Sequence, residues 1–279
     1  MVERAPPAVD PAVTSYYERA PEESRLELGP FRLEELRSRE LILRHAPESP
    51  AVALDIGGAA GAYAFWLAER GYDVRLFDAS PRLVDVAHQR NNHATHRLTS
   101  CSVADARSIP EGNDSVAMVL LLGPLYHLVH SHDRHTALSE ACRVLRPGGV
   151  LIAAGISRWA SALDGLAREL MRDNEFARIV ERDMRDGNHE NPTGQLDYFT
   201  TAYFHRPEEL RSEVIDAGFE PLGLYGVEGP GWMLPDFDER WNDLERREIL
   251  LRTARALESE PAVMGCSAHL LMAGRKPQT

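Results

Sequence analysis

Hydrophobic positions in the middle of the chain form short runs, separated by stretches with helical spacing. The run at 116–122 is continuously apolar, which is typical of a parallel strand buried on both faces. Strands are predicted at 51–56, 74–77, 98–103, 116–122 and 150–154, with helices at 61–69, 81–91 and 134–145 between them. Strands that alternate with helices of this length indicate βαβ units and a parallel sheet.

The segments on either side of this core are mainly helical in pattern. Residues 14–45 have apolar positions at helical spacing, and Pro47 and Pro50 then interrupt the chain. Further elements are predicted as a long amphipathic helical stretch at 158–186 that allows one break, helices at 207–216 and 236–259, a loop at 187–194, and closing strands at 222–227 and 267–273. We therefore expect an N-terminal helical cover (1–50), a core (51–156), a helical lid insertion (157–205) and a C-terminal part of the core (206–279).

Three acidic residues follow the first three predicted strands in order. Asp55 lies in a strand that runs directly into the glycine-rich turn 57–61 and then a helix, where free backbone N–H groups can meet a carboxylate or phosphate. Asp78 ends the next strand, and in doubly wound nucleotide-binding folds an acid there accepts hydrogen bonds from ribose hydroxyls. Asp105 follows the third strand and can accept from an adenine amino group. The alternatives are a generic strand-to-helix turn, a helix N-cap at Asp78 and an ordinary turn at Asp105.

Taken together, these motifs resemble a family. The pattern Asp55-x-Gly57-x-Ala59-x-Gly61, then Asp78, Asp105, a strand that ends in Leu122-Gly123-Pro124-Leu125-Tyr126-His127, and Leu145-Arg-Pro-Gly-Gly149 resembles the class I S-adenosylmethionine-dependent methyltransferases over residues 50–156. The segments Tyr16-Tyr17-Glu18 and 226–232 resemble bacterial members with unassigned acceptors. The resemblance implies an α/β fold: a doubly wound, Rossmann-like, mostly parallel sheet with helices on both faces and a helical lid insertion.

The same resemblance implies which residues bind the cofactor, S-adenosylmethionine. Asp55 and the backbone of 57–61 would hold its methionine end, Asp78 its ribose hydroxyls, and Asp105 with the backbone of 104–106 its adenine. The backbone of Leu122 and Gly123 would lie beside the amino group of the cofactor and form the floor of the acceptor site. Ala59 stands where the family most often has glycine, which narrows the turn slightly. The implied cofactor-binding set is Asp55, Gly57, Gly58, Ala59, Gly61, Asp78, Ala79, Ala104, Asp105, Ala106, Leu122 and Gly123.

A dinucleotide-dependent oxidoreductase is the rival interpretation of the glycine-rich turn. Gly57-x-Ala59-x-x-Ala62 is a degraded form of that fingerprint, and Asp78 would serve NAD equally well. Asp55 argues against it, because a negative charge just before the turn repels a pyrophosphate. Asp105 has no evident role there either, so the methyltransferase order of motifs fits better.

Histidines and aromatic residues are the candidates for the acceptor side. His127 follows the fourth strand at the edge where ligands bind in such sheets, and His205 is a second candidate base; each has a structural alternative. His130, His132 and His135 lie in or near a loop after that strand, and no metal site is expected. Aromatic residues predicted to line the acceptor site, unless they are simply core, are Tyr16, Tyr17, Tyr126, Tyr198, Phe199, Tyr203 and Trp232.

Charge and cysteine content narrow the partners. The formal net charge is −12, which argues against nucleic acid and against an anionic membrane surface. No apolar run approaches a membrane span, and the first residues show no signal-peptide pattern. Cys101, Cys142 and Cys266 are far apart with no CxxC, so a reducing cytoplasm is expected.

We therefore predict a cytoplasmic monomer or homodimer that transfers a methyl group from S-adenosylmethionine to an O, N or C atom of a small molecule. One alternative is an enzyme of the same fold that uses this cofactor for other chemistry, such as cyclisation. The other is a cofactor-binding module without turnover.

Overall fold

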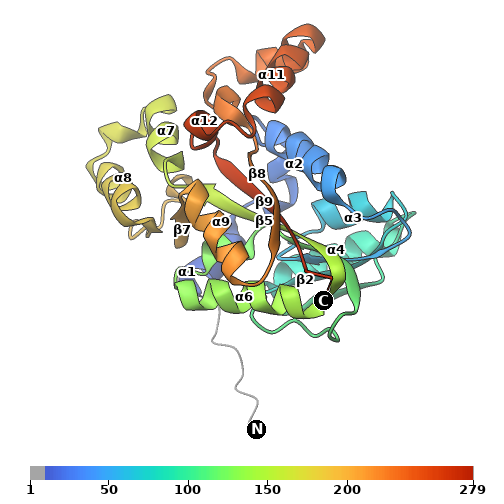
Figure 1. Ribbon diagram of the computed structural model, residues 1–279. Coiled ribbons are helices and arrows are strands. Elements are labelled where there is room, and N and C mark those ends of the chain that lie inside the picture. The colour runs from blue at the N-terminus through green and yellow to red at the C-terminus, as the bar shows by residue number, and fades with distance from the viewer. Residues whose placement is uncertain (1–9, 279) are drawn as a thin grey trace.

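The computed structural model describes residues 10–278, in which a central sheet has helices on both of its faces (Figure 1). The order of the main strands is β3-β2-β1-β4-β5, all parallel, and β9 and β8 then continue the sheet in the antiparallel sense. The strands are β1 (Val52–Ile56), β2 (Asp73–Asp78), β3 (Ser100–Val103), β4 (Val116–Leu121), β5 (Leu145–Ser157), β6 (Asn188–His189), β7 (Ala202–His205), β8 (Glu220–Gly226) and β9 (His269–Arg275). This confirms the predicted α/β, mostly parallel fold.

The helical elements connect these strands and extend beyond them. In the first half of the chain they are α1 (Pro11–Arg19), η1 (Glu22–Glu27), α2 (Phe31–His45), α3 (Ala62–Ala68), α4 (Pro81–His93), α5 (Pro124–His127) and α6 (Ser131–Val144). In the second half they are α7 (Ala160–Ala167), η2 (Leu170–Arg172), α8 (Asn174–Asp186), η3 (Leu196–Tyr198), α9 (Pro207–Asp216), η4 (Gly229–Met233), α10 (Phe237–Asn242), α11 (Leu244–Leu257) and α12 (Pro261–Met264). None of the helices within residues 10–278 is both long and apolar enough to cross a membrane.

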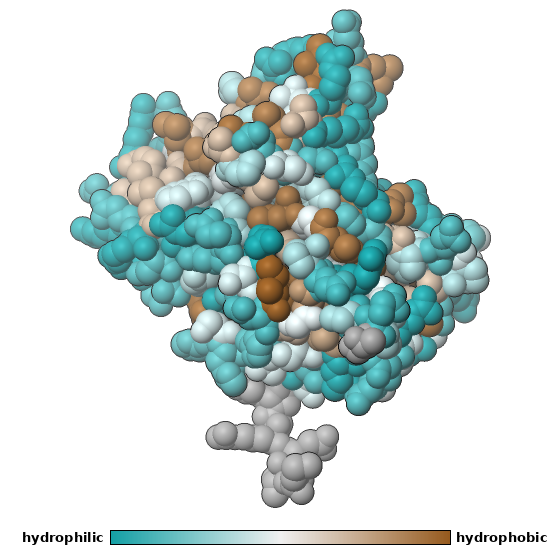
Figure 2. All heavy atoms as spheres, in the orientation of Figure 1, coloured by the Kyte–Doolittle hydropathy of each residue, from teal (hydrophilic) through white to brown (hydrophobic). Residues whose placement is uncertain are grey.

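Alternate residues of each central strand pack on opposite faces of the sheet. In β4, Met118 and Leu120 join a core with α2, α3 and α4, whereas Val119 and Leu121 join a second core with α5, α6 and α9. This two-residue period is what strand geometry requires, and burial on both faces explains the continuous apolar run of β4. Hydrophilic residues predominate on the face in Figure 2, and hydrophobic ones lie there in small scattered groups.

The flanking segments consist of several shorter helical elements. Residues 14–45 form three pieces, α1, η1 and α2, because Pro21 and the Gly29-Pro30 turn interrupt them. The stretch 158–186 is broken at Glu169, which has a positive φ of 60°. The predicted N-terminal cover includes residues 1–9, which lie outside the described part of the chain.

The insertion 157–205 is not wholly helical, because its last residues rejoin the sheet as β7. Ile156 of β5 pairs with Phe204 of β7 and also with His269 of β9. Strand β7 therefore pairs with the same edge of β5 as β4 does, but at the carboxyl end of β5, beyond the residues that pair with β4. The start of β9 lies beside the end of β5, because the two strands are antiparallel. His269 is thus brought to the same edge of the sheet as the carboxyl ends of the parallel strands.

Candidate functional site

A cavity of about 530 Å³ lies at the carboxyl edge of the parallel strands. Its wall includes residues that follow β1, β2, β3 and β4, and also residues of η1, α2 and the start of β9. Eleven of the twelve predicted cofactor residues line it: Asp55, Gly57, Gly58, Ala59, Asp78, Ala79, Ala104, Asp105, Ala106, Leu122 and Gly123. Gly61 is the exception, and it caps α3 with a left-handed φ of 88°. The structure thus gathers the sequence motifs around one volume.

The glycine-rich turn is too tight for larger side chains. A Cβ atom on Gly57 would lie 2.5 Å from Pro124 Cδ, and one on Gly58 would lie 2.7 Å from Asp55 Oδ2. Gly57 also has a φ of 73°, which favours glycine. Ala59 adopts a φ of 48° in the same turn, so its departure from the family pattern puts a β-carbon on a left-handed backbone. The turn leaves its backbone open to close approach by a ligand.

Asp55 is a buried carboxylate with one unused oxygen. It is 1% exposed, and its Oδ2 has no hydrogen-bond partner among the described residues. Burial, helped by the nearby Asp78 carboxylate, raises the pKa of Asp55 to about 7. An unpartnered buried carboxylate beside a glycine turn fits a ligand with a cationic group, such as an ammonium or a sulfonium.

Asp78 ties the two loops of the cofactor region together. Its Oδ2 accepts from the backbone N–H of Ala59 at 2.8 Å, and its Oδ1 accepts from Ser80 N at 2.8 Å. Burial raises the pKa of Asp78. The cap of α4 is not Asp78 but Ser80, whose hydroxyl accepts from Leu83 N at 3.3 Å. The alternative role of Asp78 as the N-cap is therefore wrong, and its carboxylate faces the cavity.

Asp105 is held by its neighbour Arg107. The Asp105 carboxylate accepts from Arg107 N at 2.8 Å, Nε at 2.9 Å and Nη2 at 2.7 Å. Arg107 also lies 3.4 Å from Asp133, so this acid and base belong to a small network. Recognition of an adenine by Asp105 stays a prediction, and the adjoining backbone of Ala104 and Ala106 lines the cavity beside it.

His127 lines the cavity, as expected, but both of its ring nitrogens are engaged. Nδ1 donates to Thr201 O at 3.1 Å, and Nε2 then accepts from the Tyr17 hydroxyl at 2.8 Å. Burial lowers the pKa of His127 to about 4. The geometry describes a neutral ring that joins α1, α5 and the insertion, and it does not favour the predicted role as a base.

His205 lies away from the cavity wall. It is fully buried at the end of β7, where its Nε2 lies 3.2 Å from Glu213 Oε2 of α9, and burial lowers its pKa. His205 is absent from the cavity lining, because β7 turns it towards α9 instead. Its predicted role as a second base has no support from its position.

Only some of the predicted aromatic residues reach the cavity. Tyr17 and Tyr126 line it. Tyr16 and Phe199 pack behind them, with their ring centroids 5.3 Å apart.

Three other predicted acceptor-binding residues are committed elsewhere, which corrects the prediction for them. Tyr198 packs on Phe176, Tyr203 lies under the guanidinium of Arg134, and Trp232 Nε1 donates to Cys266 O at 2.9 Å. No residue of 157–205 is in the cavity wall, because the insertion packs behind α1 and α5.

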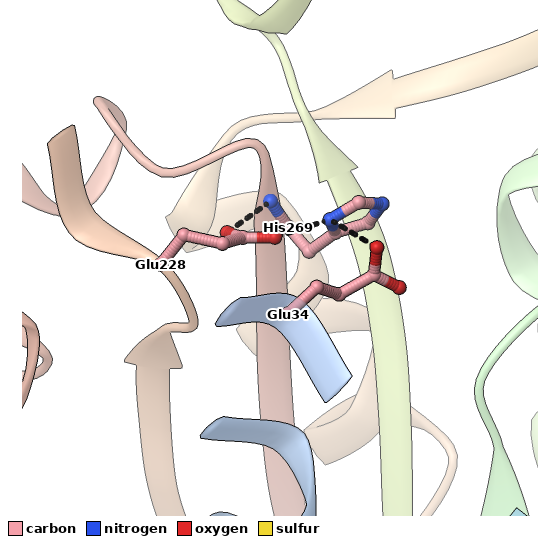
Figure 3. A group of neighbouring side chains, drawn as sticks. All are labelled: Glu34, Glu228 and His269. Carbon is pink, nitrogen blue, oxygen red and sulfur yellow. Dashed lines mark hydrogen bonds and ion pairs between the residues drawn. The ribbon is translucent and has the colours of Figure 1, made fainter. Parts of the chain in front are cut away.

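The sequence interpretation missed a group of charged residues in the cavity region: Arg25, Glu34, Glu228 and His269. Arg25 donates to Glu34 at 2.7 and 3.0 Å, and His269 Nδ1 donates to Glu228 Oε1 at 2.5 Å (Figure 3). His269 Nδ1 also lies 3.8 Å from Glu34 Oε2. The available signal was a lone histidine that opens an apolar strand and a lone glutamate between Val227 and Gly229.

Comparison with known proteins gives this arrangement a family. A model described as a methyltransferase domain matches residues 53–149, the stretch that contains the turn, Asp78 and Asp105. Residues 53–149 are a class I methyltransferase domain. The cofactor of the domain is S-adenosylmethionine. S-adenosylmethionine carries cationic groups, which the unpartnered Asp55 oxygen can accept. The tight glycine turn lets the cofactor approach the backbone closely, so the residues present fit this cofactor.

Relatives of this chain match it over part of its length. Methyltransferase GfsG of Streptomyces halstedii is 33% identical over 105 residues, which are 37% of each protein. The chain therefore spans about a third of the length of that relative. The ubiquinone/menaquinone biosynthesis C-methyltransferase UbiE of Rickettsia rickettsii is 25% identical over 68% of this chain and 77% of its own. The crystal structure of the [4+2]-cyclase SpnF has the same fold, with a TM-score of 0.54 and 20% identity over 88% of this chain and 81% of its own.

Proposed function

We propose that the chain transfers the methyl group of S-adenosylmethionine to a small-molecule acceptor. The observation that carries the proposal is one continuous cavity, lined at one part by the cofactor motifs and at another by Tyr126 and His269. Its volume of about 530 Å³ is in the range of small-ligand sites. A small acceptor is in keeping with the name of UbiE, which acts in ubiquinone and menaquinone biosynthesis.

The cofactor supplies an intrinsically reactive sulfonium methyl group, so the residues of the chain mainly position the partners and exclude water. Asp78 and the turn 57–61 would hold the ribose and methionine parts. Asp55 would pair with a cationic group of the cofactor, which would return its carboxyl group to the ionised form. The adenine would lie against the backbone of 104–106.

Water is excluded by residues 10–27, the part of the predicted N-terminal cover that contains α1 and η1. Thr14, Tyr17 and Arg25 of this segment line the cavity, and Arg82 of α4 donates to Tyr17 O at 2.6 Å. Tyr17 is also hydrogen-bonded to His127. In this proposal His127 is a positioning residue: it holds the cover closed rather than removing a proton.

Two alternatives share the same cavity. SpnF is a cyclase with this fold, so the fold by itself does not determine methyl transfer. A module that binds the cofactor without turnover would also have the glycine turn and Asp78. The match of residues 53–149 to a methyltransferase domain favours methyl transfer.

The test combines cofactor binding with product detection. Calorimetry should show that S-adenosylmethionine binds, and incubation with pooled small-molecule extract should release S-adenosylhomocysteine together with a product heavier by one methyl group. Methylthioadenosine as the released product would favour cyclisation or other chemistry. Binding without any cofactor product over the whole extract would favour the binding module. Absence of cofactor binding would overturn the proposal.

Nucleic acid is not the acceptor in this proposal. A chain with a net charge of −12 offers little to a polyanion. Tight binding of duplex DNA or tRNA at about 0.15 M salt would contradict this part of the proposal.

A further inference from the structure

The part of the cavity beyond β4 contains hydrogen-bond donors that the protein itself does not use. Along the carboxyl edge of the sheet, Asp78 follows β2, Asp55 lies at the end of β1, and Leu122 follows β4. The next position along this edge is the start of β9, beside β5, where His269 lines the cavity. The cofactor motifs occupy the edge as far as β4, so His269 stands in the space left for an acceptor.

His269 is held in one orientation by Glu228. The ring Nδ1 donates to Glu228 Oε1 at 2.5 Å, and the backbone N–H of His269 donates to Glu228 Oε2 at 3.0 Å. Glu228 is 2% exposed and also accepts from the Ser267 hydroxyl at 2.5 Å. In Figure 3 the dashed lines from the ring to the two carboxylates both start at Nδ1, and none starts at Nε2. No described residue makes a hydrogen bond to Nε2, so it is available to a ligand.

The neighbouring charges keep this ring protonated. Glu228 and Glu34 raise the pKa of His269 to about 9 despite burial and the opposing charge of Arg25. At neutral pH both ring nitrogens are therefore donors, and Nε2–H has no acceptor of its own. Tyr126 adds a second donor: this residue lines the cavity, its hydroxyl makes no hydrogen bond to a described residue, and burial raises its pKa.

The carboxylates of this region, in contrast, are already paired. Glu34 receives two hydrogen bonds from Arg25, at 2.7 and 3.0 Å, and Glu22 receives one from Arg25 Nε at 2.9 Å. Glu228 is satisfied by Ser267 and His269. One oxygen from each of Glu34 and Glu228 and one nitrogen of His269 lie within 4.8 Å of one another, as metal ligands would. A cation there would have to displace Arg25 and the ring proton, so an ion-paired network explains the cluster better.

We propose that His269, oriented by Glu228, binds an ionised oxygen of the acceptor, which makes the acceptor a small oxygen acid such as a carboxylate, a phenol or an enol. Unused donors and paired carboxylates suit an oxyanion and do not suit an ammonium group. An anion is also the charge that a cationic cofactor attracts. The inference rests on the proposed function only in calling the ligand an acceptor, since binding of the anion can be measured by itself.

The probes are benzoate and 4-nitrophenol as oxygen acids, with benzylamine as a cation of matched size. Their dissociation constants are measured by NMR titration of the full chain, with and without S-adenosylhomocysteine. His269→Asn is the main variant, because the asparagine amide can still donate to Glu228 but the Nε2 donor is gone. His132→Asn is the matched control, since His132 is exposed on α6. The Nε2 signal of His269 provides a readout that is independent of activity.

We expect benzoate and the phenolate to bind more tightly than benzylamine, and His269→Asn to weaken both by about tenfold or more. Tyr126→Phe should weaken them by about threefold, and His132→Asn should not change them. Benzoate should shift the Nε2 resonance. Unchanged benzoate binding in folded His269→Asn, tighter binding of benzylamine, or no binding of either acid at millimolar concentration would each overturn the proposal. Binding of Zn²⁺ or Mn²⁺ that depends on His269 would overturn it as well.

Cofactor calorimetry separates this proposal from the proposed function. His269→Asn should bind S-adenosylmethionine with wild-type affinity. A chain that binds the acids through His269 but binds no S-adenosylmethionine would overturn the function and leave the anion site standing. A chain that binds the cofactor but binds the acids independently of His269 would do the reverse.

Discussion

The two halves of the cavity are built in different ways. The half under β1, β2 and β3 is made from three short strand-to-loop units within residues 53–107, and its acids are held by near neighbours: Asp78 by backbone N–H groups and Asp105 by Arg107. The half beside β4 and β9 is made from Arg25, Glu34, Tyr126 and His269, whose positions are scattered over most of the chain. Its charges are held by other side chains. The first half is therefore encoded by a local motif, and the second depends on how remote segments pack.

This contrast leads to a functional expectation. Changes in the first half should alter cofactor affinity without regard to the acceptor, and changes in the second half should leave cofactor affinity unchanged.

The largest effect is expected from Asp78→Ala. The change removes the acceptor for the backbone N–H groups of Ala59 and Ser80 and the proposed acceptor for the ribose hydroxyls, and charge-assisted hydrogen bonds contribute about 1.5–3 kcal/mol each. Calorimetry should show a loss of cofactor affinity of tenfold or more. Asp85→Ala, which changes an exposed acid of α4, is the control. Unchanged affinity in a folded Asp78→Ala protein would mean that the first half does not bind the cofactor.

Asp55→Asn should raise the stability of the cofactor-free protein at pH 8 and weaken cofactor binding. Because the pKa of Asp55 is about 7 in the folded chain and the ordinary value is 3.8, the folded state retains this proton more strongly. The free energy of unfolding of the cofactor-free protein therefore falls as the pH rises from about 4 to about 7. Asparagine does not ionise, so the variant should not lose this free energy of unfolding. It should be more stable than wild type at pH 8, by about 1–3 kcal/mol.

Urea unfolding at pH 5 and pH 8 measures the stability difference, which should be largest at pH 8. Calorimetry at pH 8 should show weaker cofactor binding by Asp55→Asn. A variant that is less stable than wild type at pH 8 would show that Asp55 is not an uncompensated buried charge. It would also remove the reason for pairing Asp55 with the cofactor.

The cover can be located by hydrogen exchange with and without S-adenosylhomocysteine. The sequence predicts a mobile cover made from both 14–25 and 157–205. Since residues of 14–25 line the cavity and none of 157–205 do, protection should rise more in the first segment. Equal protection of both would favour a cover made from both segments, and no change in either would contradict a cover of any kind.

Tyr17→Phe should loosen that cover by a smaller amount. It removes the 2.8 Å hydrogen bond to His127 and leaves the ring contact between them, at a cost of about 1 kcal/mol. Exchange in α1 should become faster, and Tyr16→Phe is the matched control because Tyr16 makes ring contacts only. A turnover that falls no further in His127→Asn than in Tyr17→Phe would support a positioning role for His127. A much larger loss in His127→Asn would restore its role as a base.

The smallest effect is expected from Ala59→Gly. Ala59 has a φ of 48°, a conformation that costs an L-residue about 1 kcal/mol relative to glycine. The variant keeps the N–H that donates to Asp78 and should gain up to about this amount of stability. Cofactor affinity should stay the same or rise slightly. A loss of stability, measured by thermal unfolding, would mean that the methyl group makes a compensating contact.

The sequence predicted one kind of feature well. Alternation of apolar strands with helices predicted the parallel sheet, and the glycine turn, Asp78 and Asp105 predicted residues that the structure gathers around one cavity. These features are local: a strand, its turn and the following helix specify the position of a carboxylate within a few residues. Predicted helices failed where proline or glycine divided them, as between α1 and α2.

The sequence by itself determined the βαβ core and the cofactor half of the cavity, because hydrogen bonding and turn geometry between near neighbours set both. The tertiary structure alone decided the other half. Whether Tyr203 or Tyr126 faces the cavity depends on which helices cover them. His127 is engaged by Tyr17 and Thr201, which lie far from it along the chain, and His205 faces Glu213 of α9. Only the antiparallel pairing of β9 with β5 brings His269 to the carboxyl edge, where Glu228 orients its ring and Glu34 and Arg25 surround it. Such positions follow from packing and ion pairing over long sequence separations, which a local pattern of residues does not record.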